Sequence, residues 1–232
     1  MLETIAYTDG ETALTGHLAR PTGTPRAAVL VFPTIANVTP AIERRALMLA
    51  DAGFLALIAD FYGEPVESFE ASRPLADALR SSVDGYRARI LAGLAALDAI
   101  EPTLPKVAIG YCMGGQAALE LARAGGDVAL VASFHGILDT GRPATAESPI
   151  GPRILVCHGD ADPLVPRSQV LAFWEEMDAA RANWHFHAYS GVKHGFTDPG
   201  SDARGMAAIA YDESADRQSW SALMAMLAEV VG

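Results

Sequence analysis

The segment Gly-Tyr-Cys-Met-Gly-Gly at residues 110–115 decides the fold of this chain. An apolar, strand-like run precedes it at 107–109, and a helix-forming run follows it at 116–122. The order of strand, sharp turn and helix presents the side chain of Cys112 at the carboxyl end of a strand and above a helix N-terminus. Glycines on either side let the backbone turn without a clash at Cβ. The segment therefore predicts a nucleophile, and that nucleophile is a thiol rather than a hydroxyl.

Outward from this turn, strand-like and helix-like patterns alternate along the chain. The expected strands span residues 4–8, 12–18, 27–32, 54–59, 106–109, 128–134, 153–157 and 184–189. The expected helices span residues 41–52, 74–100 (as one long or broken helix), 116–124, 168–179 and 215–230. The first two strands should form a hairpin. Strands that alternate with helices predict the α/β class, as one domain over residues 1–232 with a mostly parallel central sheet and helices on both faces.

Composition excludes several classes of protein. Half of the 232 residues are hydrophobic and 19% are charged, so the chain is expected to fold rather than to be disordered. The net charge of −11 argues against nucleic acid or an anionic membrane as a partner. No apolar run approaches the ~20 residues of a membrane-spanning helix, and the first residues lack the pattern of a secretory signal. We therefore expect a cytoplasmic monomer or small homo-oligomer that acts on a small molecule.

The cysteines and histidines suggest no cofactor. The two cysteines, Cys112 and Cys157, are too few for a disulfide framework, and their spacing fits no zinc pattern. Cys157 lies in an apolar, strand-like run, and we interpret it as a buried packing residue. We expect neither a metal ion nor an organic cofactor.

A thiol nucleophile needs a base, and the base needs an acid that orients it. Two aspartates, Asp160 and Asp162, follow the strand at 153–157, and His194 follows the next strand in a loop with glycines on both sides. The chain order nucleophile, acid, base is the one found in sheet enzymes with such a turn. From the residues alone either aspartate could be the acid, and one of them is expected to serve the turn instead.

Three motifs together resemble the dienelactone hydrolase family of α/β-hydrolases. They are Gly-Tyr-Cys-Met-Gly-Gly, His-Gly-Asp-Ala-Asp-Pro-Leu-Val-Pro at 158–166 and Lys-His-Gly-Phe at 193–196. The resemblance extends from residue 27 to the final helix and implies the α/β-hydrolase fold. It also implies a catalytic triad of Cys112, His194 and Asp162, which leaves Asp160 as the turn residue.

The resemblance further implies an oxyanion hole made by the backbone N–H groups of Ile35 and Met113. Two positions depart from the family pattern. Thr34 stands where the family enzyme has a glutamate, and Asp198 stands at about the position of an arginine that holds the substrate carboxylate. An aspartate would repel a carboxylate, so we expect small, mainly uncharged esters, with lactones also possible.

The expected substrate pocket contains Thr34, Tyr111, His135 and Phe196, which lie near the ends of expected strands. The predicted reaction is hydrolysis of an ester or lactone through a thioester on Cys112. One alternative is a ligand-binding protein without catalysis on a hydrolase scaffold. Another is a redox or peroxidase role for the thiol, which would require a resolving cysteine nearby. A third keeps the hydrolase but makes it a thioesterase or amidase.

Overall fold

The computed structural model describes residues 2–232. Within these residues eight strands form one sheet, in the order β1-β2-β4-β3-β5-β6-β7-β8. The strands are β1 (Glu3–Asp9), β2 (Thr12–Ala19), β3 (Ala28–Phe32), β4 (Leu55–Ile58), β5 (Lys106–Tyr111), β6 (Leu130–Phe134), β7 (Arg153–Gly159) and β8 (Asn183–Tyr189). The hairpin β1–β2 and the pair β2–β4 are antiparallel, and all neighbours from β4 to β8 are parallel. The predicted α/β class with a mostly parallel sheet is confirmed.

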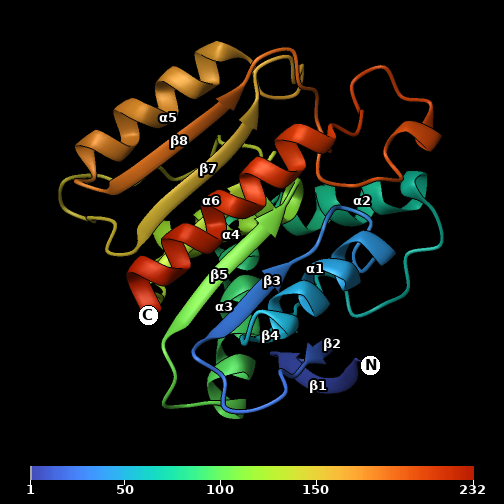
Figure 1. Cartoon of the computed structure of the whole chain (residues 1–232), viewed down its shortest axis with the longest axis vertical. Helices are drawn as coiled ribbons and strands as arrows, with labels where there is room; N and C mark the ends of the chain where they lie inside the picture. The colour runs from blue at the N-terminus through green and yellow to red at the C-terminus, as the bar shows by residue number, and fades with distance from the viewer. Residues whose placement is uncertain (1) are drawn as a thin grey trace.

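The helices cover both faces of this sheet (Figure 1). They are α1 (Pro40–Asp51), α2 (Phe69–Arg80), α3 (Val83–Ile100), α4 (Met113–Arg123), α5 (Arg167–Ala179) and α6 (Glu213–Val231), together with the short 3₁₀ helix η1 (Asp202–Arg204). Helices α1 and α6 pack on one face, and α3, α4 and α5 pack on the other. Within residues 2–232, no helix has both the length and the apolar character needed to cross a bilayer.

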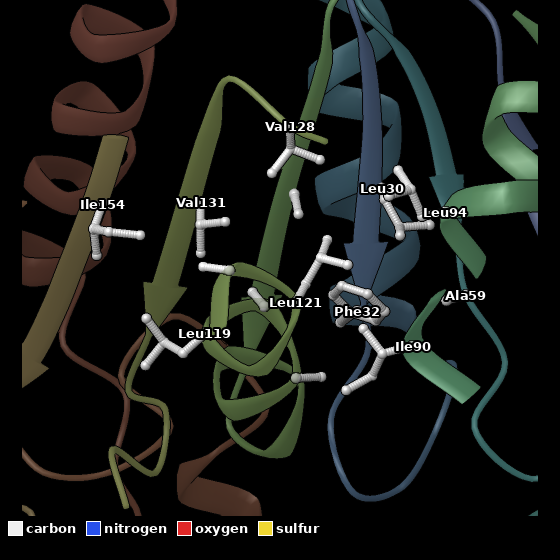
Figure 2. Close-up of a cluster of buried hydrophobic side chains, with 14 of the residues drawn as sticks. Leu30, Phe32, Ala59, Ile90, Leu94, Leu119, Leu121, Val128, Val131 and Ile154 are labelled. Atoms are coloured by element: carbon white, nitrogen blue, oxygen red, sulfur yellow. The ribbon is translucent and has the colours of Figure 1, made fainter. Parts of the chain in front are cut away.

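Alternating side chains of the central strands divide the core into two layers. Along β3, Leu30 and Phe32 pack toward α3 and α4, whereas Val29 and Val31 pack toward α1 and α6. Figure 2 shows the first of these layers, in which Phe32 lies close to Ile90 of α3. A strand buried on both faces explains why the sequence of β3 is a continuous apolar run rather than an alternating one.

The expected helix over residues 74–100 is divided into α2 and α3. The break falls at Ser81 and Ser82, and the Ser82 side chain caps α3 by accepting the N–H of Gly85 at 3.2 Å. Helix α2 begins earlier than expected because Ser68 caps it in the same way, and Pro74 lies inside the helix instead of at its start. Serine capping, which competes with helix continuation, is therefore the physical reason for the break.

The carboxyl ends of the parallel strands meet at one edge of the sheet, where open α/β folds build their sites. The loop at 33–37 follows β3, Cys112 follows β5 and His135 follows β6. Asp162 follows β7 and His194 follows β8. Residues far apart in the chain are thus brought to the same edge.

Candidate active site

Cys112 lies in a strained turn between β5 and α4. Its φ of 57° and ψ of −118° are unusual for a residue with a side chain. Its N–H is shared between the carbonyl of Phe134 at 3.1 Å and Nδ1 of His135 at 3.2 Å. A Cβ atom at Gly114 would overlap the carbonyl oxygen of Phe32, so only glycine lets α4 approach β3 this closely. The surrounding packing holds the thiol in an orientation that an unstrained turn would not give.

Asp162 and His194 form a buried hydrogen-bonded pair. The carboxylate Oδ2 of Asp162 lies 2.7 Å from Nδ1 of His194, and its Oδ1 accepts the N–H of Leu164 at 2.9 Å. The His194 backbone is fixed as well, because its N–H donates to Ala208 and its carbonyl accepts from Ala210, both at 3.1 Å. A proton on Nδ1 leaves Nε2 of the ring free to exchange a proton with a neighbour.

The thiol and the imidazole influence each other electrostatically. Burial is the largest influence on Cys112 and opposes ionisation, but the charge of His194 and nearby N–H groups outweigh it, so the pKa of the thiol lies below its ordinary value. Burial would likewise lower the pKa of His194, but the Cys112 thiolate and the Asp162 carboxylate raise it to about 10. The lowered pKa of Cys112 and the raised pKa of His194 both favour a thiolate–imidazolium pair at neutral pH.

Nε2 of His194 is the ring atom left to meet the sulfur. It is buried and makes no hydrogen bond of standard geometry with any of residues 2–232. Its interaction with the Cys112 side chain nevertheless combines charge with a hydrogen-bond contribution, and both raise the pKa of the imidazole. Catalytic hydrogen bonds commonly tighten only when substrate binds.

The backbone N–H groups of Met113 and Ile35 also lower the pKa of the Cys112 thiol by hydrogen bonding to its charged form. The carbonyl groups of the same two residues are held by tyrosine hydroxyls, contacts that no motif of the sequence predicted. The hydroxyl of Tyr62 donates to the carbonyl of Ile35 at 2.9 Å, and that of Tyr86 donates to the carbonyl of Met113 at 3.1 Å. A tyrosine in a loop or on a helix carries no sequence signal for such a contact.

A cavity of about 380 Å³ opens in front of Cys112. Its apolar lining comes from Ile35, Phe69, Met113, Ile137, Leu164, Met206, Ala208 and Ile209. Its charged lining comes from Arg73, Arg80, Asp139, Asp198 and Arg204. Among residues 2–232, no group of three or more histidine, cysteine, aspartate or glutamate side chains could hold a metal ion.

Of the four expected pocket residues, the structure places two in the lining. Thr34 and His135 border the cavity, but Tyr111 and Phe196 do not, so the prediction was wrong for these two. Tyr111 is the last residue of β5, and its side chain packs in the core layer that faces α1 and α6. There its ring stacks on that of Phe134, with centroids 4.8 Å apart. Phe196 is fully buried in that same layer, and the rings of Phe196 and His135 pack edge to face with centroids 5.3 Å apart.

Asp198 lines the cavity, as its position after His194 suggested, but it is not a free charge. Its carboxylate pairs with Arg204 at 2.5 Å and also accepts the N–H of Gly200 at 2.8 Å. The arginine largely offsets the repulsion that the sequence predicted for an anionic substrate. Arg204 lies in an irregular loop, and no motif or periodicity of the sequence pointed to it.

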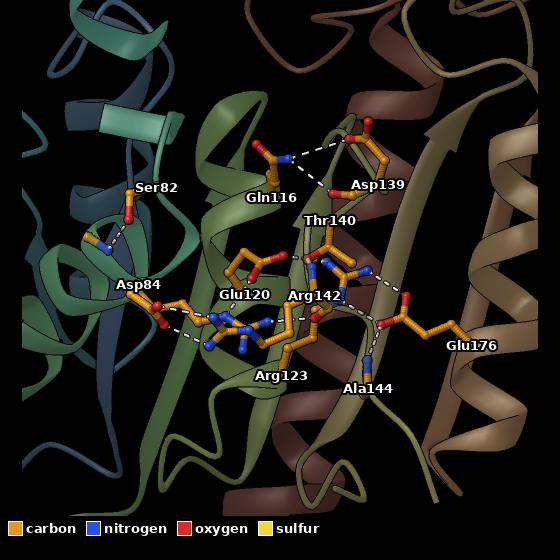
Figure 3. A network of polar contacts seen from close by, with 12 residues as sticks. Ser82, Asp84, Gln116, Glu120, Arg123, Asp139, Thr140, Arg142, Ala144 and Glu176 are labelled. Carbon is orange, nitrogen blue, oxygen red and sulfur yellow. Dashed lines mark hydrogen bonds and ion pairs between the residues drawn. The ribbon is translucent and has the colours of Figure 1, made fainter. Parts of the chain in front are cut away.

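A buried polar network holds the loop that follows β6, which carries Ile137 and Asp139 to the cavity (Figure 3). Gln116 of α4 donates to the carbonyl of Asp139 at 3.1 Å. Deeper in the fold, the fully buried guanidinium of Arg123 pairs with Glu176 of α5 at 2.7 Å, and Glu176 also accepts the N–H of Ala144, farther along the same loop, at 2.9 Å. The wall of the cavity is thus attached to two helices.

Comparison with known proteins agrees with this geometry. The chain matches the family model described as "Dienelactone hydrolase family" over residues 14–231. A solved dienelactone hydrolase-like promiscuous phosphotriesterase from metagenomic libraries is 33% identical, with a TM-score of 0.92 over 100% of this chain and 99% of that chain. A protein named "Probable 2-oxo-3-(5-oxofuran-2-ylidene)propanoate lactonase" from Bradyrhizobium sp is 29% identical over 215 residues, which are 84% of each chain.

A further relative is the uncharacterized protein K02A2.1 of Caenorhabditis elegans. It is 37% identical over 145 residues, which are 61% of this chain and 91% of that protein. The resemblance inferred from the three motifs is therefore confirmed over nearly the whole chain. The chain has the α/β-hydrolase fold and belongs to the dienelactone hydrolase family.

Proposed function

We propose that this chain cleaves small carboxylic esters or lactones through a covalent thioester on Cys112. Membership of the dienelactone hydrolase family makes it a hydrolase of ester or lactone bonds. The observation that supports the finer proposal is the convergence of three groups at one sheet edge. These are a thiol of lowered pKa, an imidazole held 2.7 Å from the Asp162 carboxylate, and two N–H groups that stabilise the thiolate.

The proposed first step is acylation. The Cys112 thiolate attacks the carbonyl carbon, and the negative charge that develops on the oxygen is stabilised by the N–H groups of Ile35 and Met113, at roughly 3 kcal/mol for each donor. The tetrahedral intermediate then collapses, the carbon–oxygen bond breaks, and the imidazolium of His194 gives its Nε2 proton to the leaving alkoxide. An alcohol leaves and an acyl thioester remains.

The second step is hydrolysis of that thioester. Neutral His194 takes a proton from water, and the resulting hydroxide attacks the acyl carbon. Collapse expels the Cys112 thiolate, so the carboxylic acid is released and the thiolate–imidazolium pair is restored. Asp162 keeps the Nδ1 proton in place and stabilises the imidazolium throughout.

The cavity supports a small substrate with an apolar acyl group. Its volume of about 380 Å³ lies near the lower end of ordinary small-molecule sites. The pairing of Asp198 with Arg204 leaves no isolated charge at that part of the lining, which is consistent with uncharged esters. The name of the Bradyrhizobium relative supports the inclusion of lactones among the substrates.

Replacing Cys112 with alanine is the direct test. We expect turnover of p-nitrophenyl acetate to be lost while the far-ultraviolet circular dichroism spectrum is unchanged. Cys157→Ala is the matched control because it removes the other, fully buried thiol, and it should retain turnover. Full turnover by the Cys112→Ala variant would refute the proposal. Binding of esters without turnover by the wild type would favour a ligand-binding protein instead.

One observation favours a second activity, toward phosphotriesters. The metagenomic structure, which is similar over the whole chain, is named a promiscuous phosphotriesterase. The same thiolate could attack phosphorus, with the phosphoryl oxygen stabilised by the same two N–H groups. Release of p-nitrophenol from diethyl p-nitrophenyl phosphate by the wild type, and its loss in Cys112→Ala, would support this activity. No release above the uncatalysed rate would exclude it.

A further inference from the structure

We propose that His135 is a positioning residue that ties the turn of Cys112 to the loop of His194. The inference rests on the proposed function in one respect, because it takes these two residues as the reacting pair. His135 directly follows β6 and is 3% exposed. Its φ of 40° is rare for a residue with a side chain and directs the ring toward the end of β5. Strain of this kind persists only where surrounding contacts hold it.

The first contact of the ring is with the nucleophile turn. Nδ1 of His135 accepts the N–H of Cys112 at 3.2 Å, in addition to the ordinary sheet hydrogen bond from that N–H to Phe134. The second acceptor acts on the residue whose own φ and ψ are strained. The ring therefore helps to hold Cys112 in the conformation that presents its sulfur.

The second contact is with the loop that carries His194. Because Nδ1 accepts, the proton of the neutral ring lies on Nε2, which is 2.9 Å from the hydroxyl of Thr197. Thr197 is buried and lies three residues after His194, and its carbonyl accepts from Arg44 at 3.0 Å and from Arg45 at 3.1 Å. One ring thus connects two segments that are far apart in the chain.

The charges around the ring keep it neutral. Burial is the largest influence, the charge of His194 adds to it, and together they lower the pKa of His135 well below its ordinary value. The rings of His135 and His194 meet edge to face with centroids 5.0 Å apart. Arg45 and Arg204 also act on the ring, and both are cationic. His135 therefore stays an acceptor at Nδ1 and a donor at Nε2 while His194 carries the positive charge.

The variants His135→Asn and Thr197→Val each break this connection at one place. Asparagine tolerates a positive φ, and its side-chain oxygen can still accept the Cys112 N–H, but it does not reach Thr197. Valine at 197 removes the hydroxyl. A displacement of about 1 Å between reacting groups lowers rates on the order of 10²-fold, so we expect each variant to lower kcat by up to about that factor with little change in KM.

Two further readouts separate positioning from general packing. The pH profile of Cys112 alkylation by iodoacetamide should shift to higher pH in both variants, because His194 stabilises the thiolate less well. The double variant should be no worse than either single variant, since both remove the same link. Thr197→Ser keeps the hydroxyl and should restore the wild-type values. His185→Asn, on the exposed side of β8, is the control and should change nothing.

The results distinguish failure of this inference from failure of the proposed function. Wild-type kcat and an unchanged alkylation profile in Thr197→Val would overturn the inference while Cys112→Ala remained inactive. Equal impairment of Thr197→Val and Thr197→Ser would also overturn it, because packing rather than the hydrogen bond would then matter. If His135→Asn does not fold, the pair of Thr197 variants decides. If Cys112→Ala kept its turnover, the alkylation profile would still test the inference without reference to catalysis.

Discussion

Replacing Asp162 with asparagine changes one atom of a fully buried side chain at the centre of the site. The carboxylate accepts two hydrogen bonds, from His194 at 2.7 Å and from Leu164 at 2.9 Å. An amide offers one acceptor and one donor. If its oxygen keeps the bond from Leu164, its NH₂ group faces Nδ1 of His194 and favours the tautomer with the proton on Nε2. That tautomer cannot accept a proton from the thiol.

The expected loss of activity is far larger than the expected loss of stability. In serine proteases the same acid-to-amide change lowers kcat by about 10⁴ because it selects the wrong tautomer, and we expect a similar factor here. A hydrogen bond to a charged group contributes ~1.5–3 kcal/mol and a neutral one ~1 kcal/mol, so the variant should lose about 0.5–2 kcal/mol of stability. For a chain of this length that corresponds to a fall in Tm of roughly 1–8 °C.

Hydrolysis of p-nitrophenyl acetate and differential scanning calorimetry measure the two effects separately. Asp160→Asn is the matched control, because Asp160 lies two residues away and pairs with the exposed Arg167 instead. It should keep nearly the wild-type kcat, because its carboxylate hydrogen-bonds Arg167 and not His194. A folded Asp162→Asn variant with nearly wild-type kcat would refute the reasoning, as would a larger loss of activity in Asp160→Asn.

Three more predictions concern the thiol, the polar network and the cavity. Because the pKa of Cys112 is lowered, the thiolate persists as pH falls until that pKa is passed. It loses its cationic partner only as pH rises through the pKa of His194, at about 10. Iodoacetamide should therefore alkylate Cys112 at about pH 6.5 faster than a model thiol, which is only ~1% ionised there, and equal rates would contradict the ion pair. Glu176→Gln breaks the buried ion pair with Arg123 and should lower the free energy of unfolding, measured in urea, by roughly 3–5 kcal/mol. A loss below about 1 kcal/mol would show that this pair is dispensable for stability. Arg204→Ala frees the carboxylate of Asp198 and should raise KM for an anionic ester but not for a neutral one. Asp198→Asn, the control, should not raise KM for the anionic ester. An equal rise in KM for both esters in Arg204→Ala would argue against an electrostatic cause.

The sequence was informative where a local pattern requires one conformation. The segment at 110–115 could hardly be anything but a strand-to-helix turn, and it fixed the place of Cys112. The order of Asp162 and His194 after successive strands was enough to bring them to the same sheet edge, because parallel strands end there. That order did not distinguish Asp162 from Asp160, and the family resemblance was needed to select Asp162, which lies 2.7 Å from His194.

The sequence was uninformative where long-range packing decides. Its pattern did not distinguish the side of β5 on which Tyr111 lies, since the strand is buried on both faces. His135 could be placed at a strand end, but its partner Thr197 is 62 residues away, and no periodicity links the two. Arg204 reaches the cavity through the path of a loop, which depends on contacts rather than on local propensity.

The proposed thioester can be observed directly. Rapid mixing of the protein with p-nitrophenyl acetate, acid quenching and mass spectrometry of the digested chain would locate any acyl group formed during turnover. We predict one acetyl group on the peptide that contains Cys112, formed at least as fast as steady-state turnover and absent from the Cys112→Ala variant. Turnover without acylation of Cys112, or acylation at another residue that accounts for the measured rate, would contradict the mechanism.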